Sequence, residues 1–374
     1  MSPSSTEIPA AASLARPFTL GGLTLANRIV MAPMTRYFSP GGVPGDDVAE
    51  YYARRAAGGT GLIITEGTYV GHASAGLSER IPRFHGDAAL AGWANVVERV
   101  HRAGGRIMPQ LWHVGMVRSA GDPPFPEAPA MGPSGTALDG TRRGHTMTLA
   151  DIDAVIGAFA GAAATAERLG FDGIELHGAH GFLIDQFLWA ATNRRGDPYG
   201  GDPASRARFA ADVVAACRAA VSPGFPIVFR TSQWKADNYD ARLAETPAGL
   251  EAVLAPIAEA GADAFHASTR RYWLPEFTGS DLNLAGWAKK LTGRPSVTVG
   301  SVGLDADVVP AFSGDQQTRV TGIDRLLDRI ERDEFDLVAV GRALIADPEW
   351  AGKVLTGRTG DTVPFSTTQL AALR

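Results

Sequence analysis

The chain has 374 residues, of which 45% are hydrophobic and 20% are charged. This apolar content is enough to bury a sizeable core, so the protein should be globular, and disorder is excluded as its main state. The 40 acidic and 35 basic side chains give a formal net charge of -5, and the sequence has no run of Lys or Arg that could follow a phosphate backbone. Nucleic acid is therefore excluded as an expected partner.

The single cysteine, Cys217, lies in an alanine-rich segment of helical spacing and has no partner for an intrachain disulfide. This fits a reducing compartment. Residues 1–17 contain Glu7 and lack the continuous apolar core of a signal peptide, and no stretch approaches the ~18 apolar residues of a membrane span. We expect a soluble cytoplasmic protein, a monomer or homo-oligomer, whose residues 1–17 form a flexible tail.

After this tail, residues 18–25 alternate apolar and polar side chains around Gly21 and Gly22, which predicts a β-hairpin that could close the bottom of a barrel. Short apolar runs then recur, each followed by a polar or glycine-rich turn and a helical pattern, as in parallel β-α units. The predicted strands are Ile29–Met34, Leu62–Glu66, Ile107–Trp112, Gly173–His177, Ile227–Thr231, Ala264–Ser268, Ser296–Gly300 and Leu337–Gly341. The predicted helices are Asp46–Gly58, Asp87–Ala103, Leu149–Leu169, Ser205–Ala220, Thr246–Ala260 and Ile323–Arg332.

Eight such units closing on themselves form an α/β fold, the (β/α)8 TIM barrel. We expect one barrel domain over residues 18–364, followed by a C-terminal tail at residues 365–374. Long loops on the C-terminal face of a barrel are where its enzymes place their sites. The predicted loops of this kind are Asp122–Pro133, Thr192–Pro203 and Arg270–Asn283. A doubly wound open sheet, for which six strands would suffice, is the alternative fold.

Polar groups gather where the predicted strands end. The last two ends, Gly300-Ser301 and Gly341-Arg342, combine glycines with a hydroxyl or a guanidinium, which lets backbone N–H groups and a cation converge on a phosphate. The earlier ends carry amide, hydroxyl, guanidinium and imidazole groups beside aromatic rings, a mixture that suits a planar heterocycle. The residues alone therefore indicate a phosphorylated aromatic cofactor, of which FMN is one.

A set of short motifs follows the predicted strands in order. They are Asn27-Arg28 with Ala32-Pro33-Met34-Thr35, Glu66-Gly67, Gln110-Leu111-Trp112-His113, His177 with His180, residues 193–201, Arg230, and Gly341-Arg342. Each piece alone is a weak signal, but all of them in order at barrel-strand ends are highly specific. Together they resemble the Old Yellow Enzyme family of FMN-dependent ene-reductases, which are 12-oxophytodienoate reductase-like, from Phe18 to about Pro364.

The resemblance implies that FMN is the cofactor and that NADH or NADPH is the reductant. It places the Thr35 hydroxyl near the flavin O4, Gly67 and Gln110 at the pyrimidine side, and Arg230 beside N1 and O2, where a guanidinium stabilises negative charge on the reduced ring. The residues implied to contact FMN are Ala32, Pro33, Met34, Thr35, Gly67, Gln110, His177, Arg230, Gly300, Ser301, Gly341 and Arg342.

His177 and His180 are implied to bind the carbonyl or nitro oxygen of the substrate, which prepares its β-carbon to accept hydride from flavin N5. The implied reaction moves hydride from NAD(P)H through FMN to electron-poor alkenes, such as α,β-unsaturated carbonyls, or to nitro compounds, with ping-pong kinetics. The residues expected to line the substrate pocket are Trp112, His177, His180, Phe182, Tyr272 and Trp273.

Phe182 departs from the family pattern. Most relatives carry a tyrosine at this place, which protonates the α-carbon after hydride transfer, and a phenyl ring has no such proton. Another acid is therefore expected, either Tyr37 or Tyr272 on neighbouring strand ends, or bulk water. The departure makes nitro compounds more plausible as substrates. Neither the physiological substrate nor the choice between NADH and NADPH follows from the sequence.

Other interpretations stay open. The two histidines could bind a metal, although no further ligand cluster accompanies them, or they could be structural. Arg230 could serve in a structural ion pair. Another FMN barrel would need a catalytic Cys or Ser loop and a nearby lysine, and a flavin-carrying protein would need no turnover. A non-redox lyase acting on a phosphorylated substrate would need a Schiff-base lysine, for which Lys235 is the only candidate.

Overall fold

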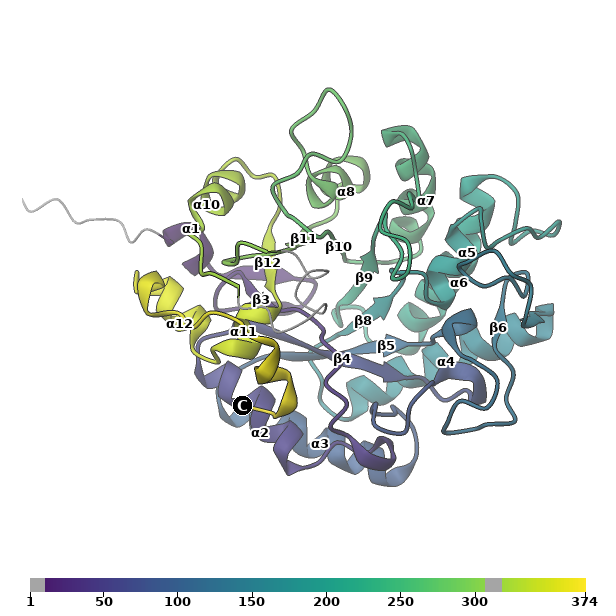
Figure 1. The fold of residues 1–374 in the computed structure, drawn as a ribbon, viewed down its shortest axis with the longest axis horizontal. Helices are drawn as coiled ribbons and strands as arrows, with labels where there is room; N and C mark the ends of the chain where they lie inside the picture. The colour runs from purple at the N-terminus through teal and green to yellow at the C-terminus, as the bar shows by residue number, and fades with distance from the viewer. Residues whose placement is uncertain (1–10, 307–317) are drawn as a thin grey trace, which may run out of the picture.

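The computed structural model of the protein describes residues 11–306 and 318–374. Its main strands are β3 (Ile29–Met31), β4 (Leu62–Tyr69), β5 (Ile107–Trp112), β8 (Ile174–His177), β9 (Ile227–Thr231), β10 (Ala264–Ser268), β11 (Ser296–Val299) and β12 (Leu337–Val340). They form a closed parallel barrel in chain order, because β12 pairs with β3 (Figure 1). Closure confirms the predicted (β/α)8 fold and excludes the open sheet.

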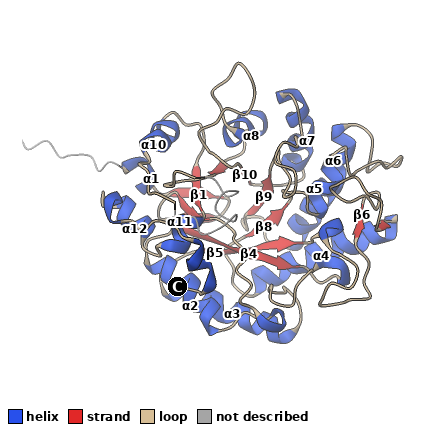
Figure 2. Ribbon diagram, in the orientation of Figure 1, coloured by secondary structure: helices blue, strands red, loops and turns tan. Residues whose placement is uncertain are grey.

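Helices surround the barrel strands (Figure 2). The longer ones are α2 (Asp46–Ala57), α3 (Asp87–Arg102), α4 (Leu149–Arg168), α6 (Pro203–Ala220), α7 (Pro247–Glu259), α8 (Leu284–Thr292) and α10 (Asp324–Glu331). The short ones are α1 (Ala12–Ala15), α5 (Leu183–Leu188), α11 (Arg342–Ala346) and α12 (Trp350–Leu355), with 3-10 turns at Pro40–Gly42, Ala73–Ala75, Gly115–Val117, Thr359–Asp361 and Thr367–Ala371.

Side-chain caps explain where several helices begin. Thr148 and Asp151 form a capping box at α4, and Asp202 and Thr246 accept backbone N–H groups at α6 and α7. The sequence patterns missed α8, which Asn283 caps and Gly293 ends with a left-handed φ of 65°. Its short length makes α8 hard to distinguish from the loop that precedes it.

The hairpin of β1 (Phe18–Leu20) and β2 (Leu23–Leu25) closes the N-terminal end of the barrel, as predicted. Gly22 N donates to the carbonyl of Gly224, close to the start of β9. Leu20 and Leu25 are buried in the same cluster as the inward-facing apolar residues of the strands. The lower barrel interior is thus a packed apolar core, which leaves polar groups to the opposite end.

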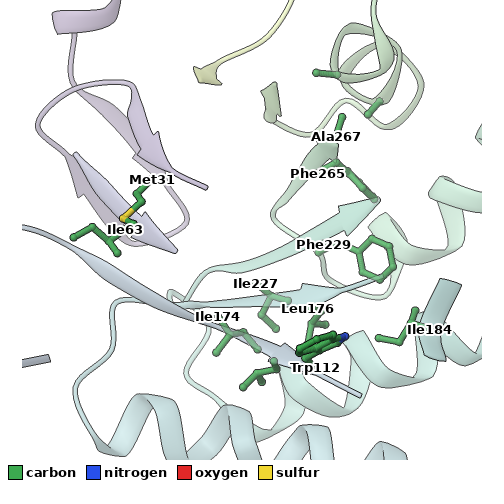
Figure 3. Close-up of a cluster of buried hydrophobic side chains, with 14 of the residues drawn as sticks. Met31, Ile63, Trp112, Ile174, Leu176, Ile184, Ile227, Phe229, Phe265 and Ala267 are labelled. Carbon is green, nitrogen blue, oxygen red and sulfur yellow. The ribbon is translucent and has the colours of Figure 1, made fainter. Parts of the chain in front are cut away.

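A second apolar cluster lies between the strands and the surrounding helices. Leu176, Phe229 and Phe265 contribute to it, together with Ile184 of α5 (Figure 3). Because side chains alternate along a strand, the residues between these face the barrel interior. On β8 the inward positions are Glu175 and His177, with Arg230 beside His177 on β9.

Helix α4 has the length and hydropathy of a membrane span, which the sequence pattern did not lead us to expect. Ile152, Val155 and Phe159 on this helix are buried in the cluster that surrounds the barrel. Core helices of globular proteins pass the same test, and packing on the barrel accounts for the apolar face of α4.

Parts of both segments that were expected to be tails pack against the rest of the chain. Residues 12–15 form α1, whose Leu14 is buried against the barrel helices, while residues 1–10 lie outside the described part. At the other end Phe365 is buried, and the Arg36 guanidinium donates to the carbonyls of Gln369, Leu370 and Ala372. The C-terminal segment at residues 365–374 is therefore held by side-chain and backbone contacts.

Candidate functional site

Two adjoining cavities lie where the barrel strands end, and Pro33, Thr35, His180 and Arg230 line both of them. The larger cavity encloses about 410 Å³ and the smaller about 150 Å³. The larger volume alone falls within the ~300–1,000 Å³ range of small-molecule sites. Of the residues expected to contact FMN, the larger cavity gathers Ala32, Pro33, Met34, Thr35, Arg230, Gly300, Ser301, Gly341 and Arg342, and the smaller adds Gln110 and His177.

The polar floor of the smaller cavity is held by Glu175. Its Oε1 accepts from Gln110 Nε2 at 2.8 Å, and its Oε2 lies 2.6 Å from His266 Nδ1. Glu175 and His266 are fully buried. Since the amide nitrogen of Gln110 donates to Glu175, the side-chain oxygen of Gln110 is left as the acceptor toward the cavity. Glu175 thus lies in a layer of the barrel interior with two hydrogen-bond partners.

Arg230 supplies donors beside this acceptor. Its NH2 donates to Ser268 Oγ at 3.2 Å, while its Nε is buried without a partner. Burial lowers the pKa of the guanidinium, and the charge of Glu175 opposes that shift. Arginine stays protonated even so. A buried donor without a partner costs about 1–3 kcal/mol, which a bound acceptor would offset.

This donor set fits a flavin ring. A heterocycle edge that carries N–H and C=O groups side by side, as the pyrimidine ring of FMN does, would satisfy both the Gln110 oxygen and the Arg230 Nε. The carboxylate of Glu175 next to Arg230 also shows that the guanidinium has a partial counter-charge within the barrel. The alternative of a purely structural Arg230 leaves its Nε unexplained.

The expected phosphate-holding residues also come together. Gly300 has a φ of 139°, and a Cβ there would lie 2.7 Å from the Thr269 carbonyl oxygen, so only glycine fits. Arg342 NH2 donates to Ser301 Oγ at 3.3 Å. Gly341 precedes α11 and lines the same cavity. Glycine backbone, hydroxyl and guanidinium thus converge as a phosphate requires.

Both motif histidines line the smaller cavity, and His180 also lines the larger one. Ala179 N donates to His177 Nδ1 at 3.4 Å, so the proton of a neutral His177 ring is on Nε2. His180 Nε2 lies 2.8 Å from Ser268 Oγ, and its ring stacks on Trp234 at 4.2 Å. Burial, and next the charge of Arg230, hold the pKa of both imidazoles well below the usual value. Both rings are therefore neutral donors at neutral pH.

The metal interpretation finds no support around this pair. Across residues 11–306 and 318–374, no group of three or more His, Cys, Asp or Glu side chains is arranged to hold a metal ion. Instead, the rings of His177 and His180 meet edge to face at 5.3 Å. Two neutral imidazoles in this arrangement suit an oxygen acceptor.

The backbone at His180 is held in an unusual conformation. His180 and Gly181 both have positive φ angles, 64° and 82°. His180 N donates to Ser232 Oγ at 2.9 Å, and Gly181 N donates to the Asp185 carboxylate at 2.6 Å. Asp185 is paired in turn with Lys235 at 2.7 Å, and both side chains are fully buried. A lysine sealed in this ion pair and lining neither cavity does not fit the Schiff-base lyase alternative.

Trp112 and Phe182 form the aromatic wall of the smaller cavity, as expected. Their rings meet edge to face at 4.7 Å, and Trp112 stacks on His177 at 5.8 Å. Gly67 does not line either cavity. A Cβ at Gly67 would lie 2.5 Å from the Trp112 ring, so the absence of a side chain at Gly67 makes room for Trp112.

The two tyrosines proposed as acids are placed very differently. Tyr37 lines the larger cavity and is 47% exposed. Tyr272 is 4% exposed and lines neither cavity; burial raises its pKa, and the charged groups that act on it, Arg325 and Arg329 first, are on α10. Tyr272, expected as an acid, and Tyr272 and Trp273, expected as pocket lining, therefore do not lie at either cavity, and the charged groups near Tyr272 are those of α10.

Several residues that line the larger cavity had no predicted role, among them Trp234, Ser268 and Leu370. Trp234 and Ser268 follow β9 and end β10, so the strand-end rule that found Arg230 could have found them. Leu370 lines the larger cavity from the C-terminal segment. It has no local sequence signal, because the bonds from Arg36 that hold this segment join residues more than 300 positions apart.

Comparison with known proteins agrees with this geometry. A model of the NADH:flavin oxidoreductase / NADH oxidase family matches residues 13–361. NADH oxidase of Thermoanaerobacter brockii is 33% identical over 351 residues, 91% of this chain, and the chain spans 50% of that protein. The morphinone reductase structure superposes with a TM-score of 0.76 at 29% identity, covering 96% of this chain and 92% of that one. Old Yellow Enzyme of Pichia sp. AKU4542 gives a TM-score of 0.79 at 23% identity, covering 96% and 90%, which supports the fold alone.

The family model covers nearly the whole barrel, and many of the residues that carried the resemblance gather at its open end. The chain therefore belongs to the FMN-dependent NADH:flavin oxidoreductase / NADH oxidase family, the family of the Old Yellow Enzymes.

Proposed function

We propose that the protein transfers hydride from NADH or NADPH to an electron-poor alkene, such as an α,β-unsaturated carbonyl compound, or to a nitro compound. Bound FMN would supply the hydride chemistry, accepting from the nicotinamide and giving to the substrate. The observation that carries the proposal is that Arg230 and both motif histidines line the smaller cavity, and that Arg230 and His180 also line the larger one.

The histidines would act on the oxygen of the substrate. His177 presents Nε2–H, and the neutral state of both rings means that each can donate one hydrogen bond without carrying charge. Donors placed at an oxygen where negative charge develops stabilise the transition state by a few kcal/mol. Polarisation of the carbonyl or nitro group would leave the β-carbon ready to accept hydride.

Protonation of the α-carbon must use a group other than Phe182. Tyr37 is the candidate among the expected acids, because its side chain is at the cavity and partly open to solvent. Water entering by the same opening is the alternative source. The proposed role of His177 and His180 does not depend on whether Tyr37 or water donates this proton.

The names of two similar proteins support parts of the proposal. One is named NADH oxidase, which fits a nicotinamide reductant, and the other morphinone reductase, which fits reduction of a small organic substrate. Neither fixes the substrate or distinguishes NADH from NADPH for this chain. Its location in the cytoplasm and its state as a monomer or homo-oligomer stay predictions from sequence.

An anaerobic titration tests the proposed function. Purified protein should be yellow or take up FMN, should bleach with NADH or NADPH, and should recover its colour on addition of an enone, a nitroester or a nitroaromatic compound. Protein that purifies colourless and takes up no FMN would overturn the proposal. Bleaching without recovery on any substrate of the panel would favour a flavin carrier over an enzyme.

A further inference from the structure

The hydroxyl of Ser268 lies between the two functional halves of the site. Its Oγ is 3.2 Å from Arg230 NH2 and 2.8 Å from His180 Nε2. Ser268 ends β10 and is 3% exposed. The three groups thus form a short chain of contacts from the guanidinium on the cofactor side to the imidazole on the substrate side.

Counting protons along this chain gives each contact a direction. A guanidinium only donates, so Ser268 Oγ is the acceptor of the Arg230 bond. The hydroxyl oxygen could accept a second bond, but its own proton also needs an acceptor. Among the contacts of Ser268 Oγ in the described part of the chain, His180 Nε2 is the one group that can accept it. A neutral imidazole that accepts at Nε2 carries its proton on Nδ1.

We propose that Ser268 is a positioning residue that fixes His180 as the Nδ1–H tautomer, so that Nδ1–H is the donor offered to the substrate oxygen. This inference rests on the proposed role of His180 as a substrate ligand. It also pairs the two histidines in opposite tautomers, because His177 accepts at Nδ1 and therefore carries its proton on Nε2.

The surroundings of His180 favour the ring orientation that this bond needs. Trp234 stacks on one face of the imidazole at 4.2 Å, and Trp234 Nε1 donates to the Ser268 carbonyl at 3.1 Å. The backbone of residue 268 therefore holds Trp234, while its side chain contacts His180. Stacking alone does not choose between the two tautomers, so that choice falls to the hydroxyl.

Histidine-selective 15N NMR of the FMN-loaded protein tests the inference without turnover. Long-range 1H–15N correlations distinguish a protonated from an unprotonated ring nitrogen, and a His180→Asn variant assigns the signals. Wild type and Ser268→Thr, which keeps the hydroxyl, should show His180 with protonated Nδ1 and bare Nε2. Ser268→Ala should lose this single tautomer. Ser232→Ala, which removes bonds to the backbone of His180 and of Trp234 but none to the His180 ring, should keep it.

Wild-type protein with a protonated His180 Nε2 would overturn the inference by itself, whether or not any variant folds. So would Ser268→Ala with an unchanged tautomer. If the enzyme also turns over, KM for the substrate should rise roughly five- to tenfold in Ser268→Ala, the factor expected for one lost hydrogen bond. The change in kcat should be smaller, and Ser268→Thr should restore the wild-type KM. Because NMR measures the tautomer without turnover, this test remains valid even if the protein does not catalyse the proposed reaction.

Discussion

Lys235 Nζ lies 2.7 Å from both carboxylate oxygens of Asp185, and neither side chain is exposed to solvent. The same carboxylate accepts from Gly181 N, next to His180. Asp185, which fixes the backbone next to His180, is therefore part of a buried ion pair. Burial raises the pKa of Asp185 and lowers that of Lys235, while the charge of each partner opposes these shifts.

Asp185→Asn should destabilise the protein strongly. It leaves the buried Lys235 ammonium without a counter-charge, which typically costs about 3–5 kcal/mol of the free energy of unfolding. Urea denaturation followed by circular dichroism measures this loss. The double variant Asp185→Leu with Lys235→Met should regain a large part of the stability, since it removes both charges. A double variant no more stable than Asp185→Asn would contradict the assignment of the loss to the unpaired charge.

The hydroxyl of Tyr37 should matter for turnover, and that of Tyr272 should not. Tyr37 lines the larger cavity, whereas Tyr272 lines neither cavity. In Tyr37→Phe we expect re-oxidation of the reduced enzyme by an enone to slow on the order of tenfold or more, the low end for loss of a general acid. Stopped-flow absorbance measures this half-reaction, with Tyr272→Phe as the matched control. Unchanged rates in both variants would assign the proton to water.

Gly67→Ala should damage the aromatic wall of the substrate side. The added Cβ would lie 2.5 Å from the ring of Trp112, so that ring must move away from its stack on His177. We expect substrate KM to rise at least several-fold, with a stability loss on the order of 1–3 kcal/mol for the overpacking. Gly196→Ala meets no atom within 4 Å and serves as the control. Normal KM in Gly67→Ala would show that Trp112 has no part in substrate binding.

The sequence predicted the barrel well because its strands carry a repeated pattern. The predicted bounds of β5, β9 and β10 are those of the structure, since each is an apolar run ended by polar groups. Strand ends then placed Arg230, Gln110 and both motif histidines at one site, because parallel strands of a barrel end on the same face.

The features that the sequence did not predict depend on the direction in which a side chain points and on contacts between residues far apart in the chain. Tyr272 follows a strand end as Tyr37 does, but its loop turns the ring toward α10. Gly67 is beside the site, yet its purpose is visible only from the position of Trp112. Leu370 reaches the cavity because Arg36 holds the C-terminal segment, a contact without any local pattern. Rules based on spacing place residues near a face but do not orient them.

Glu66 should make the stability of the protein depend on pH. Its carboxylate is buried and accepts from Arg36 N at 3.0 Å, at the loop that forms the cavity edge. Burial raises its pKa from 4.5 to about 7. Because the folded state binds this proton more tightly than the unfolded state, the stabilisation is present below pH 4.5 and is lost as pH rises through about 7.

The glutamine of Glu66→Gln cannot ionise, so this variant should not lose stability as pH rises through about 7. Relative to wild type, its free energy of unfolding at pH 8 should be higher by up to roughly 3 kcal/mol, and the difference should shrink toward pH 5. Thermal unfolding at both pH values measures it, and Glu127→Gln, at an exposed position, is the control. A Glu66→Gln variant whose stability relative to wild type is the same at pH 5 and pH 8 would contradict this prediction. It would mean that the hydrogen bonds from the backbone at Arg36 and Tyr37 keep Glu66 ionised throughout that range.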